Sequence, residues 1–131
     1  MEFPFGQPID AVIQFAYTVP DLAAEMRWWT DELGVGPWFV SDRIDGEGST
    51  YRGEPSRAEF ALALAFSGHT MVELIQTLDD EPSIYKEAYE RHGYGFHHVA
   101  KAVPNVTGAW RASLDWDGTR PLRDFAELLP A

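Results

Sequence analysis

Apolar positions along the first half of the chain alternate between the period of a strand and the period of a helix. An apolar run rich in β-formers ends at Pro20, because proline cannot donate a hydrogen bond to a sheet. Asp21 then suits a helix N-cap, apolar residues recur every three to four positions, and Gly34 is a natural stop. Between Glu59 and Phe66 large and small apolar residues alternate, which is typical of a strand. The predicted elements are strands over residues 11–19, 36–40, 59–66 and 70–76, a short strand near 50–52, and a helix over 22–33.

The second half begins with a helix and then repeats the start of the chain. Acidic residues from Asp80 onward and Pro82 suit the first turn of a helix that stops at Gly93. A second apolar run ends at Pro104, and the capping residue Asn105 follows it. The pattern predicts a strand over residues 96–103 and a helix over 106–114.

The two apolar runs are copies of one motif at a constant offset. Residues 14–22 align without a gap with residues 98–106, which lie 84 positions later (98 − 14). Strand, proline, cap and helix match in one register, which indicates two modules of the same kind. We therefore predict a single α+β domain, residues 1–131, in which paired βαβββ modules form a curved mixed or antiparallel sheet with helices outside. Its parts are a first module over residues 11–77, a linking helix over 78–94 and a second module over 95–131.

The second module is expected to be incomplete. A copy of equal length would end near position 160 (76 + 84), whereas the sequence has 131 residues. Either the module is a shortened variant or another subunit supplies the absent strands. Because an unpaired sheet edge favours pairing with another chain, we expect a homodimer.

Composition narrows the classes of partner and site. The chain has 21 acidic and 10 basic residues, and its net charge of −11 repels phosphate backbones and anionic lipid. We therefore expect neither nucleic acid nor a membrane as a partner. The absence of cysteine excludes disulfides, thiolate metal sites and cysteine nucleophiles. Without a signal-peptide pattern or an apolar stretch that could span a bilayer, the expected location is the cytoplasm.

Four short motifs occur in an informative order, namely VPDL at 19–22, LGVGP at 33–37, VELI at 72–75 and FHHVA at 96–100. In this order and spacing, the chain resembles the vicinal oxygen chelate superfamily. That superfamily includes glyoxalase I, methylmalonyl-CoA epimerase, extradiol dioxygenases and bleomycin-resistance proteins. The resemblance extends to about Trp110 and implies paired modules around a pocket.

The resemblance also implies a set of metal ligands, Gln14, Glu73 and His98, at the positions that metal-binding members use. Glutamine stands where histidine is commoner in the superfamily. These donors suit Zn²⁺, Mn²⁺, Co²⁺, Ni²⁺ or Fe²⁺. Such an ion would polarise a substrate carbonyl while the Glu73 carboxylate, the predicted catalytic group, moves the proton.

Strand alternation agrees with part of this site. Gln14 shares a strand face with Ala16 and Thr18, and small neighbours beside a polar residue leave room for a ligand. Tyr51 and Arg52 lie in the loop that shapes the pocket in relatives. The predicted substrate-binding residues are Tyr51, Arg52 and Thr18.

Structural roles compete with these assignments. Gln14 could serve as a hydrogen-bonding residue within the sheet, and a histidine in a strand, such as His98, is commonly structural. Glu73 is the hardest to explain in this way, since an inward carboxylate is costly unless another group compensates it.

Two functions follow, in different classes. The first is a metal-dependent lyase, isomerase or epimerase that acts on a small carbonyl compound or thioester. The alternative is a metal-free protein that binds or sequesters an apolar small molecule. A third possibility is a relic that keeps the fold without activity.

Overall fold

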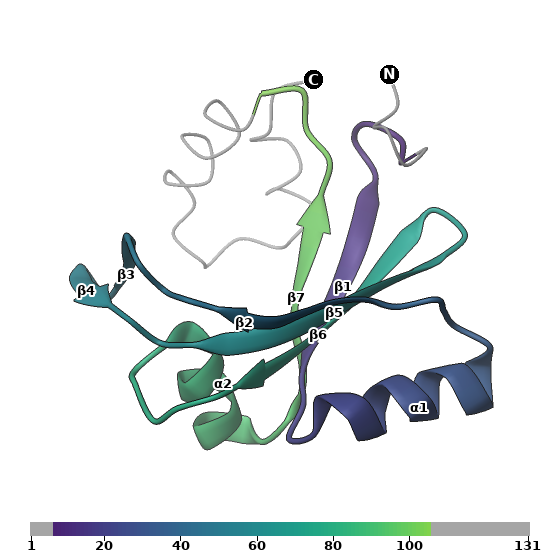
Figure 1. Ribbon diagram of the computed structural model, residues 1–131. Helices are drawn as coiled ribbons and strands as arrows, with labels where there is room; N and C mark the ends of the chain where they lie inside the picture. The colour runs from purple at the N-terminus through teal and green to yellow at the C-terminus, as the bar shows by residue number, and fades with distance from the viewer. Residues whose placement is uncertain (1–6, 106–131) are drawn as a thin grey trace. The chain divides into compact units, whose positions relative to one another are not determined.

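The computed structural model describes residues 7–105 of the chain (Figure 1). The helix predicted over 106–114 therefore lies outside the described residues. The chain divides into two compact units, one of residues 13–100 and one that combines residues 1–12 and 101–131. Within the described part of the second unit, the Asp10 N–H donates to the Ala102 carbonyl at 2.8 Å and the Ala102 N–H donates to the Ala11 carbonyl at 3.0 Å.

A mixed five-stranded sheet confirms the predicted α+β class. The strand order is β2-β5-β6-β1-β7, and a separate hairpin contains β3 and β4. Strand β1 runs parallel to β6, whereas β6 with β5 and β5 with β2 are antiparallel. The elements in chain order are β1 (Val12–Thr18), α1 (Leu22–Leu33), β2 (Phe39–Ile44), β3 (Ser49–Tyr51), β4 (Glu54–Ser56), β5 (Phe60–Ser67), β6 (Thr70–Thr77), α2 (Ile84–His92) and β7 (Gly95–Lys101).

Helix α1 has the ends that the sequence predicts. The Asp21 carboxylate accepts a hydrogen bond from the Ala24 N–H at 3.1 Å, which satisfies a free donor of the first turn. At the other end Gly34 has a φ of 66°, and its N–H donates to the Thr30 carbonyl at 3.0 Å. Both contacts are local in sequence, which explains why the prediction of residues 22–33 is confirmed.

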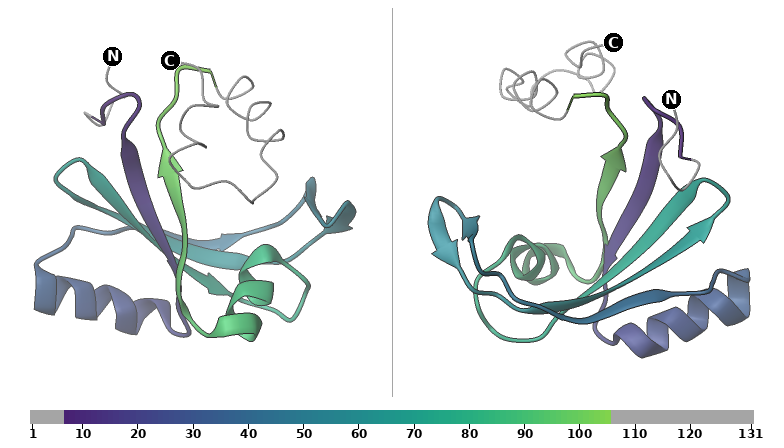
Figure 2. Two further views of the ribbon diagram at one scale, coloured as in Figure 1. Left: turned by 180° about the vertical axis from the view of Figure 1, so that it is seen from behind. Right: turned by 45° about the horizontal axis from the view of Figure 1, so that its top comes forward.

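The two faces of the sheet are covered by different helices (Figure 2). The strand residues whose side chains point toward α1 are small or apolar. Among them Ala63 and Leu74 are fully buried. The alternate strand residues point toward α2. On this face the rings of Phe60 and Tyr85 are 5.2 Å apart, and the Tyr89 hydroxyl lies 3.1 Å from the Thr77 hydroxyl. This second face also carries Glu73, because its side-chain direction follows the same alternation.

Helix α2 and strand β2 have boundaries that differ from the prediction by three or more residues. Helix α2 begins at Ile84 with Ser83 as its N-cap, rather than near Asp80. The Asp79 carboxylate accepts hydrogen bonds from the N–H groups of Glu59 and Glu81, at 3.0 and 3.1 Å, and this holds the chain in a turn before the helix. Strand β2 extends beyond residue 40 because it pairs with β5 through a polar stretch. Within residues 7–105 no helix is long and apolar enough to cross a membrane.

Candidate functional site

A glutamine and a glutamate meet on the sheet face opposite α1. In the parallel pairing of β1 with β6, Gln14 lies beside Met71 and Ala16 beside Glu73. The Gln14 Nε2 donates a hydrogen bond to Glu73 Oε2 at 2.6 Å and lies 3.3 Å from the Met71 sulfur. Two of the three predicted ligands are thus in direct contact, and Ala16 between them adds little bulk.

The carboxyl group of Glu73 has an unusual environment. It is partly buried on an apolar face, where its partner on β5 is Leu64. Burial raises the pKa of Glu73, and the hydrogen bond from Gln14 offsets part of this rise. Burial also raises the pKa of Tyr85, and the nearby Glu73 charge raises it further. A partly buried carboxyl with a raised pKa and a nearby phenol are groups that can take part in proton transfer.

His98, the third predicted ligand, contacts its neighbour His97. The Nε2 of His97 lies 3.2 Å from the Ile84 carbonyl, so this nitrogen carries the proton and donates to that oxygen. In this tautomer the Nδ1 of His97 accepts from the Nδ1–H of His98 at 2.7 Å. Burial lowers the pKa of His98, and the neighbouring His97 lowers it further, which favours the neutral form of the His98 ring. The ring of His97 also lies 5.1 Å from that of Tyr85, which places His97 against α2.

These contacts bear on whether a metal ion fits. Across the described part of the chain, no three His, Cys, Asp or Glu side chains are grouped so that they could hold an ion. Gln14 directs its N–H group at Glu73, whereas a metal would require its oxygen. The described residues therefore bring two predicted ligands together without completing a three-ligand set.

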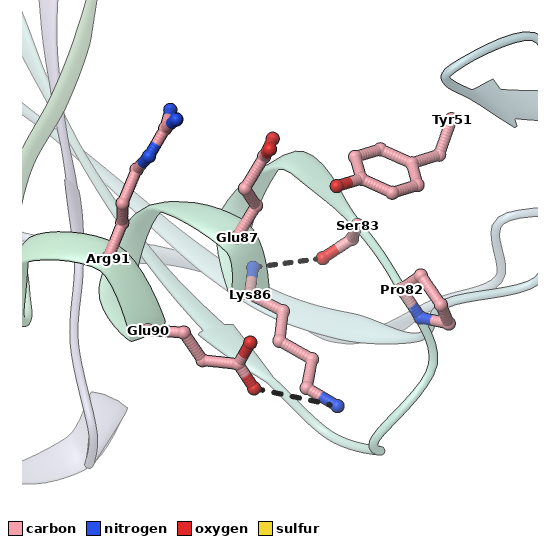
Figure 3. A pocket seen from close by; sticks show the side chains of 7 residues that line it. All are labelled: Tyr51, Pro82, Ser83, Lys86, Glu87, Glu90 and Arg91. Atoms are coloured by element: carbon pink, nitrogen blue, oxygen red, sulfur yellow. Dashed lines mark hydrogen bonds and ion pairs between the residues drawn. The ribbon is translucent and has the colours of Figure 1, made fainter.

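A cleft lies between the β3–β4 hairpin and α2. Figure 3 shows the residues that line its outer part. Its inner cavity, of about 190 Å³, is lined by Phe60, Tyr85 and several hydroxyl-bearing residues. Its outer cavity, of about 350 Å³, is lined by charged residues of α2. Tyr51 and Ser83 line both cavities, so the two are neighbours. The outer lining is Tyr51, Pro82, Ser83, Lys86, Glu87, Glu90 and Arg91.

The structure separates the predicted substrate-binding residues. Tyr51 lines the cleft, and Arg52 donates to its hydroxyl at 3.2 Å while it forms an ion pair with Glu87. Thr18, by contrast, is only 3% exposed, and its hydroxyl lies 3.4 Å from both the N–H and the carbonyl of Gly95. Its side chain therefore contacts the start of β7, away from the cleft.

The sequence did not identify Tyr85, His97 or Arg91 as site residues. Tyr85 and Tyr89 are four positions apart, and both face the sheet. Their spacing along a helix was the sequence signal that could have indicated this. The contact of His97 with Tyr85 depends on how α2 packs, which no local pattern specifies.

A family model described as the Glyoxalase/Bleomycin resistance protein/Dioxygenase superfamily matches residues 13–122. No curated protein sequence is significantly similar to the chain.

Solved structures with a similar fold include a hypothetical protein from Bacillus halodurans C-125, with 15% identity and a TM-score of 0.57 over 79% of this chain and 64% of that one. Methylmalonyl-CoA epimerase from Mycobacterium tuberculosis shares 17% identity, with a TM-score of 0.54 over 82% of this chain and 65% of the epimerase. Streptomyces coelicolor methylmalonyl-CoA epimerase, in complex with 2-nitronate-propionyl-CoA, shares 16% identity, with a TM-score of 0.59 over 86% and 73% of the two chains. The chain thus spans just under two thirds of the first two relatives. At these identities the likeness shows the fold alone.

Proposed function

Because the chain belongs to the Glyoxalase/Bleomycin resistance protein/Dioxygenase superfamily, we propose that it is an enzyme that moves a proton at the carbon beside a carbonyl group. Its reaction class is that of an isomerase, epimerase or lyase, and its substrate is a small carbonyl compound or thioester. The superfamily fold alone does not select this chemistry. The observation that carries the proposal is the partly buried Glu73 carboxyl, which receives a 2.6 Å hydrogen bond from Gln14 and lies beside Leu64 on the sheet.

Glu73 is the proposed acid–base group. Because Oε2 accepts from Gln14, Oε1 is the oxygen left to take the proton from the substrate carbon. The C–H electron pair then moves onto the substrate carbonyl oxygen and forms an enolate. Return of the proton from Glu73 to a neighbouring atom regenerates the carboxylate and completes an isomerisation. In an epimerisation the planar enolate instead receives a proton on its opposite face, and Glu73 releases its own proton to solvent.

Tyr85 is the proposed hydrogen-bond donor to the developing enolate oxygen. Its raised pKa keeps the phenol protonated over the neutral range. A protonated donor in a partly buried site stabilises negative charge more strongly than the same donor in water. Gln14 acts as a positioning residue, since its N–H fixes the orientation of the Glu73 carboxylate.

A divalent ion at Gln14, Glu73 and His98 stays a prediction. Its test is elemental analysis of protein purified without chelator or affinity tag. We expect about one first-row ion per subunit. The ion should be lost in a His98→Ala variant. Protein that takes up no Zn²⁺, Mn²⁺, Co²⁺ or Ni²⁺ would rule out this ligand set.

One observation favours the alternative of a metal-free binding protein. The inner cavity presents the rings of Phe60 and Tyr85, as a pocket for an apolar small molecule would. A binding protein needs no proton transfer, so the two functions differ in what Glu73 does. Hydrogen exchange at the carbon beside the carbonyl distinguishes the two functions, whereas the affinity for a small molecule does not.

The decisive experiment follows solvent deuterium into the carbon beside the carbonyl of a panel of small ketones, aldehydes and thioesters by NMR. We expect exchange of at least one compound and a loss of roughly 100-fold or more in a Glu73→Gln variant. The matched control is Glu32→Gln, an exposed glutamate on α1. Exchange that survives Glu73→Gln would overturn the assignment of Glu73.

A further inference from the structure

A small aromatic cavity lies between α1, the end of β1 and the start of β7 (Figure 1). Its volume is about 170 Å³, and its lining is Tyr17, Thr18, Val19, Glu25, Trp28, Trp29, Tyr94 and Gly95. These residues differ from those that line the cleft between the β3–β4 hairpin and α2. The cavity is therefore a second candidate site, which the proposed proton transfer does not use.

Aromatic rings from three parts of the chain bound this cavity. The rings of Trp28 and Trp29, which are neighbours on α1, have centroids 5.8 Å apart and stand at 83° to each other. The ring of Tyr17 on β1 lies 5.6 Å from that of Trp29. Tyr94, which precedes β7, supplies another ring, and this ring stacks on Tyr89 at 4.7 Å. Contacts among the rings thus fix their arrangement before a ligand enters.

A single carboxylate, that of Glu25, lies among these rings, and no lysine or arginine of residues 7–105 lines the cavity. The Glu25 side chain is partly buried, and it has no hydrogen-bond or ion-pair partner in that part of the chain. Two backbone donors at the start of α1 are already occupied, since the Leu22 N–H donates to Gln76 at 2.8 Å and the Ala24 N–H to Asp21 at 3.1 Å. The charge of the cavity therefore favours a cation over an anion.

The combination of ring faces and one carboxylate suits a quaternary ammonium group. Such a cation is attracted by the faces of aromatic rings, among which tryptophan is the best. It has no N–H donors, so it needs no set of acceptors, which these rings could not supply. The cavity is smaller than the roughly 300 Å³ at which pockets for drug-sized ligands begin, and this size suits a small head group. The net charge of −11 attracts cations from solution.

We propose that this cavity binds a small organic cation through its quaternary ammonium group. Trp28 and Trp29 attract the cation through their ring faces, and Glu25 supplies the opposite charge. Tyr17 packs with α1 on the sheet face opposite the one that carries Glu73, so binding here does not require proton transfer there.

The test is an NMR titration of the full chain with choline, followed through the indole N–H signals. The comparison ligand is 3,3-dimethyl-1-butanol, which has the shape of choline without its charge. We expect saturable binding of choline, and binding of the neutral alcohol that is weaker by roughly 5-fold or more. The indole signal that is lost in Trp28→Leu belongs to Trp28, and choline should shift this signal in the wild type.

Two variants separate the contribution of the ring from that of the charge. Trp28→Leu keeps an apolar side chain at a position that is 51% exposed, and it should weaken choline binding roughly 3-fold or more. Glu25→Gln keeps the shape of the side chain and should also weaken binding roughly 3-fold or more, with the larger effect at low salt. The matched control is Glu32→Gln, which removes the same charge from α1 outside the cavity and should bind choline as the wild type does.

Three results would overturn the inference. They are the absence of saturable choline binding, equal binding of choline and the neutral alcohol, and binding that is unchanged in Trp28→Leu or in Glu25→Gln. Thermal melts check that each variant is folded. Because the titration needs no turnover, its outcome and that of the deuterium exchange experiment are decided separately.

Discussion

At the scale of single residues, the raised pKa of Glu73 makes stability depend on pH. The folded state holds the Glu73 proton more tightly than the unfolded chain, whose ordinary value is 4.5. The stability contributed by the protonated acid is therefore complete below that value and is lost as pH rises through the folded pKa. Glu73→Gln keeps an oxygen that accepts from Gln14 and cannot ionise. We expect this variant to melt a few degrees above wild type near pH 7.5 and at the same temperature below about pH 4.

Thermal melts of both proteins across this pH range check the prediction. A difference in melting temperature that does not change with pH would contradict it, because a purely structural effect of the amide has no titration. Wild type and variant must be compared in the same buffers, since the net charge of −11 makes the whole chain sensitive to salt.

For two of the predicted site residues, strand alternation alone decides the side-chain direction. Glu73 and Gln14 belong to neighbouring strands, and the sheet faces of both follow from the period of two. The contacts of His97 and His98 depend on the packing of α2, because the Ile84 carbonyl fixes the His97 tautomer. That contact joins segments whose relative placement the sequence does not specify. The metal role of His98 and the substrate role of Thr18 stay predictions.

At the scale of elements, local signals sufficed for both ends of α1 and for the end of α2 at Gly93, but they misplaced the start of α2. Asp21 and Gly34 act within their own turns, so their residue types locate both ends of α1. The start of α2 is set by Asp79, which binds the backbone N–H of Glu59 across 20 positions of sequence. A long-range contact of this kind overrides the helix-start signal at Asp80 and Pro82.

The glycine that ends α1 gives a quantitative test of the local account. Gly34 has a φ of 66°, and a Cβ built there would meet no atom within 4 Å. The cost of Gly34→Ala is therefore the left-handed backbone alone, and we expect about 1 kcal/mol less free energy of unfolding. Gly34→Asn should cost less, because asparagine tolerates this conformation better. Urea denaturation measures both, and equal losses for the two variants would contradict the explanation.

At the scale of the whole molecule, the two edges of the sheet favour self-association. Strand β2 forms one edge and exposes 62% of Phe39, and β7 forms the other and exposes 55% of Phe96. Among residues 7–105 neither edge strand has a partner on its outer side. Apolar residues on such edges favour pairing with another chain. We therefore expect a homodimer, with a mass near twice 14.7 kDa by light scattering. Phe39→Lys or Phe96→Lys should shift it toward monomer, and a wild-type monomer at high concentration would contradict this expectation.

The family and the α+β class were within reach of the sequence because they rest on the order of strands, caps and turns. The chemistry of the site could not be predicted from the sequence, because it depends on which side chains come into contact. The most direct test of the central claim is the rate of deuterium incorporation beside a carbonyl, measured for wild type and Glu73→Gln side by side. The account predicts measurable exchange by the wild type and a rate roughly 100-fold lower or more in the variant. Equal rates in two folded proteins would show that Glu73 does not move the proton.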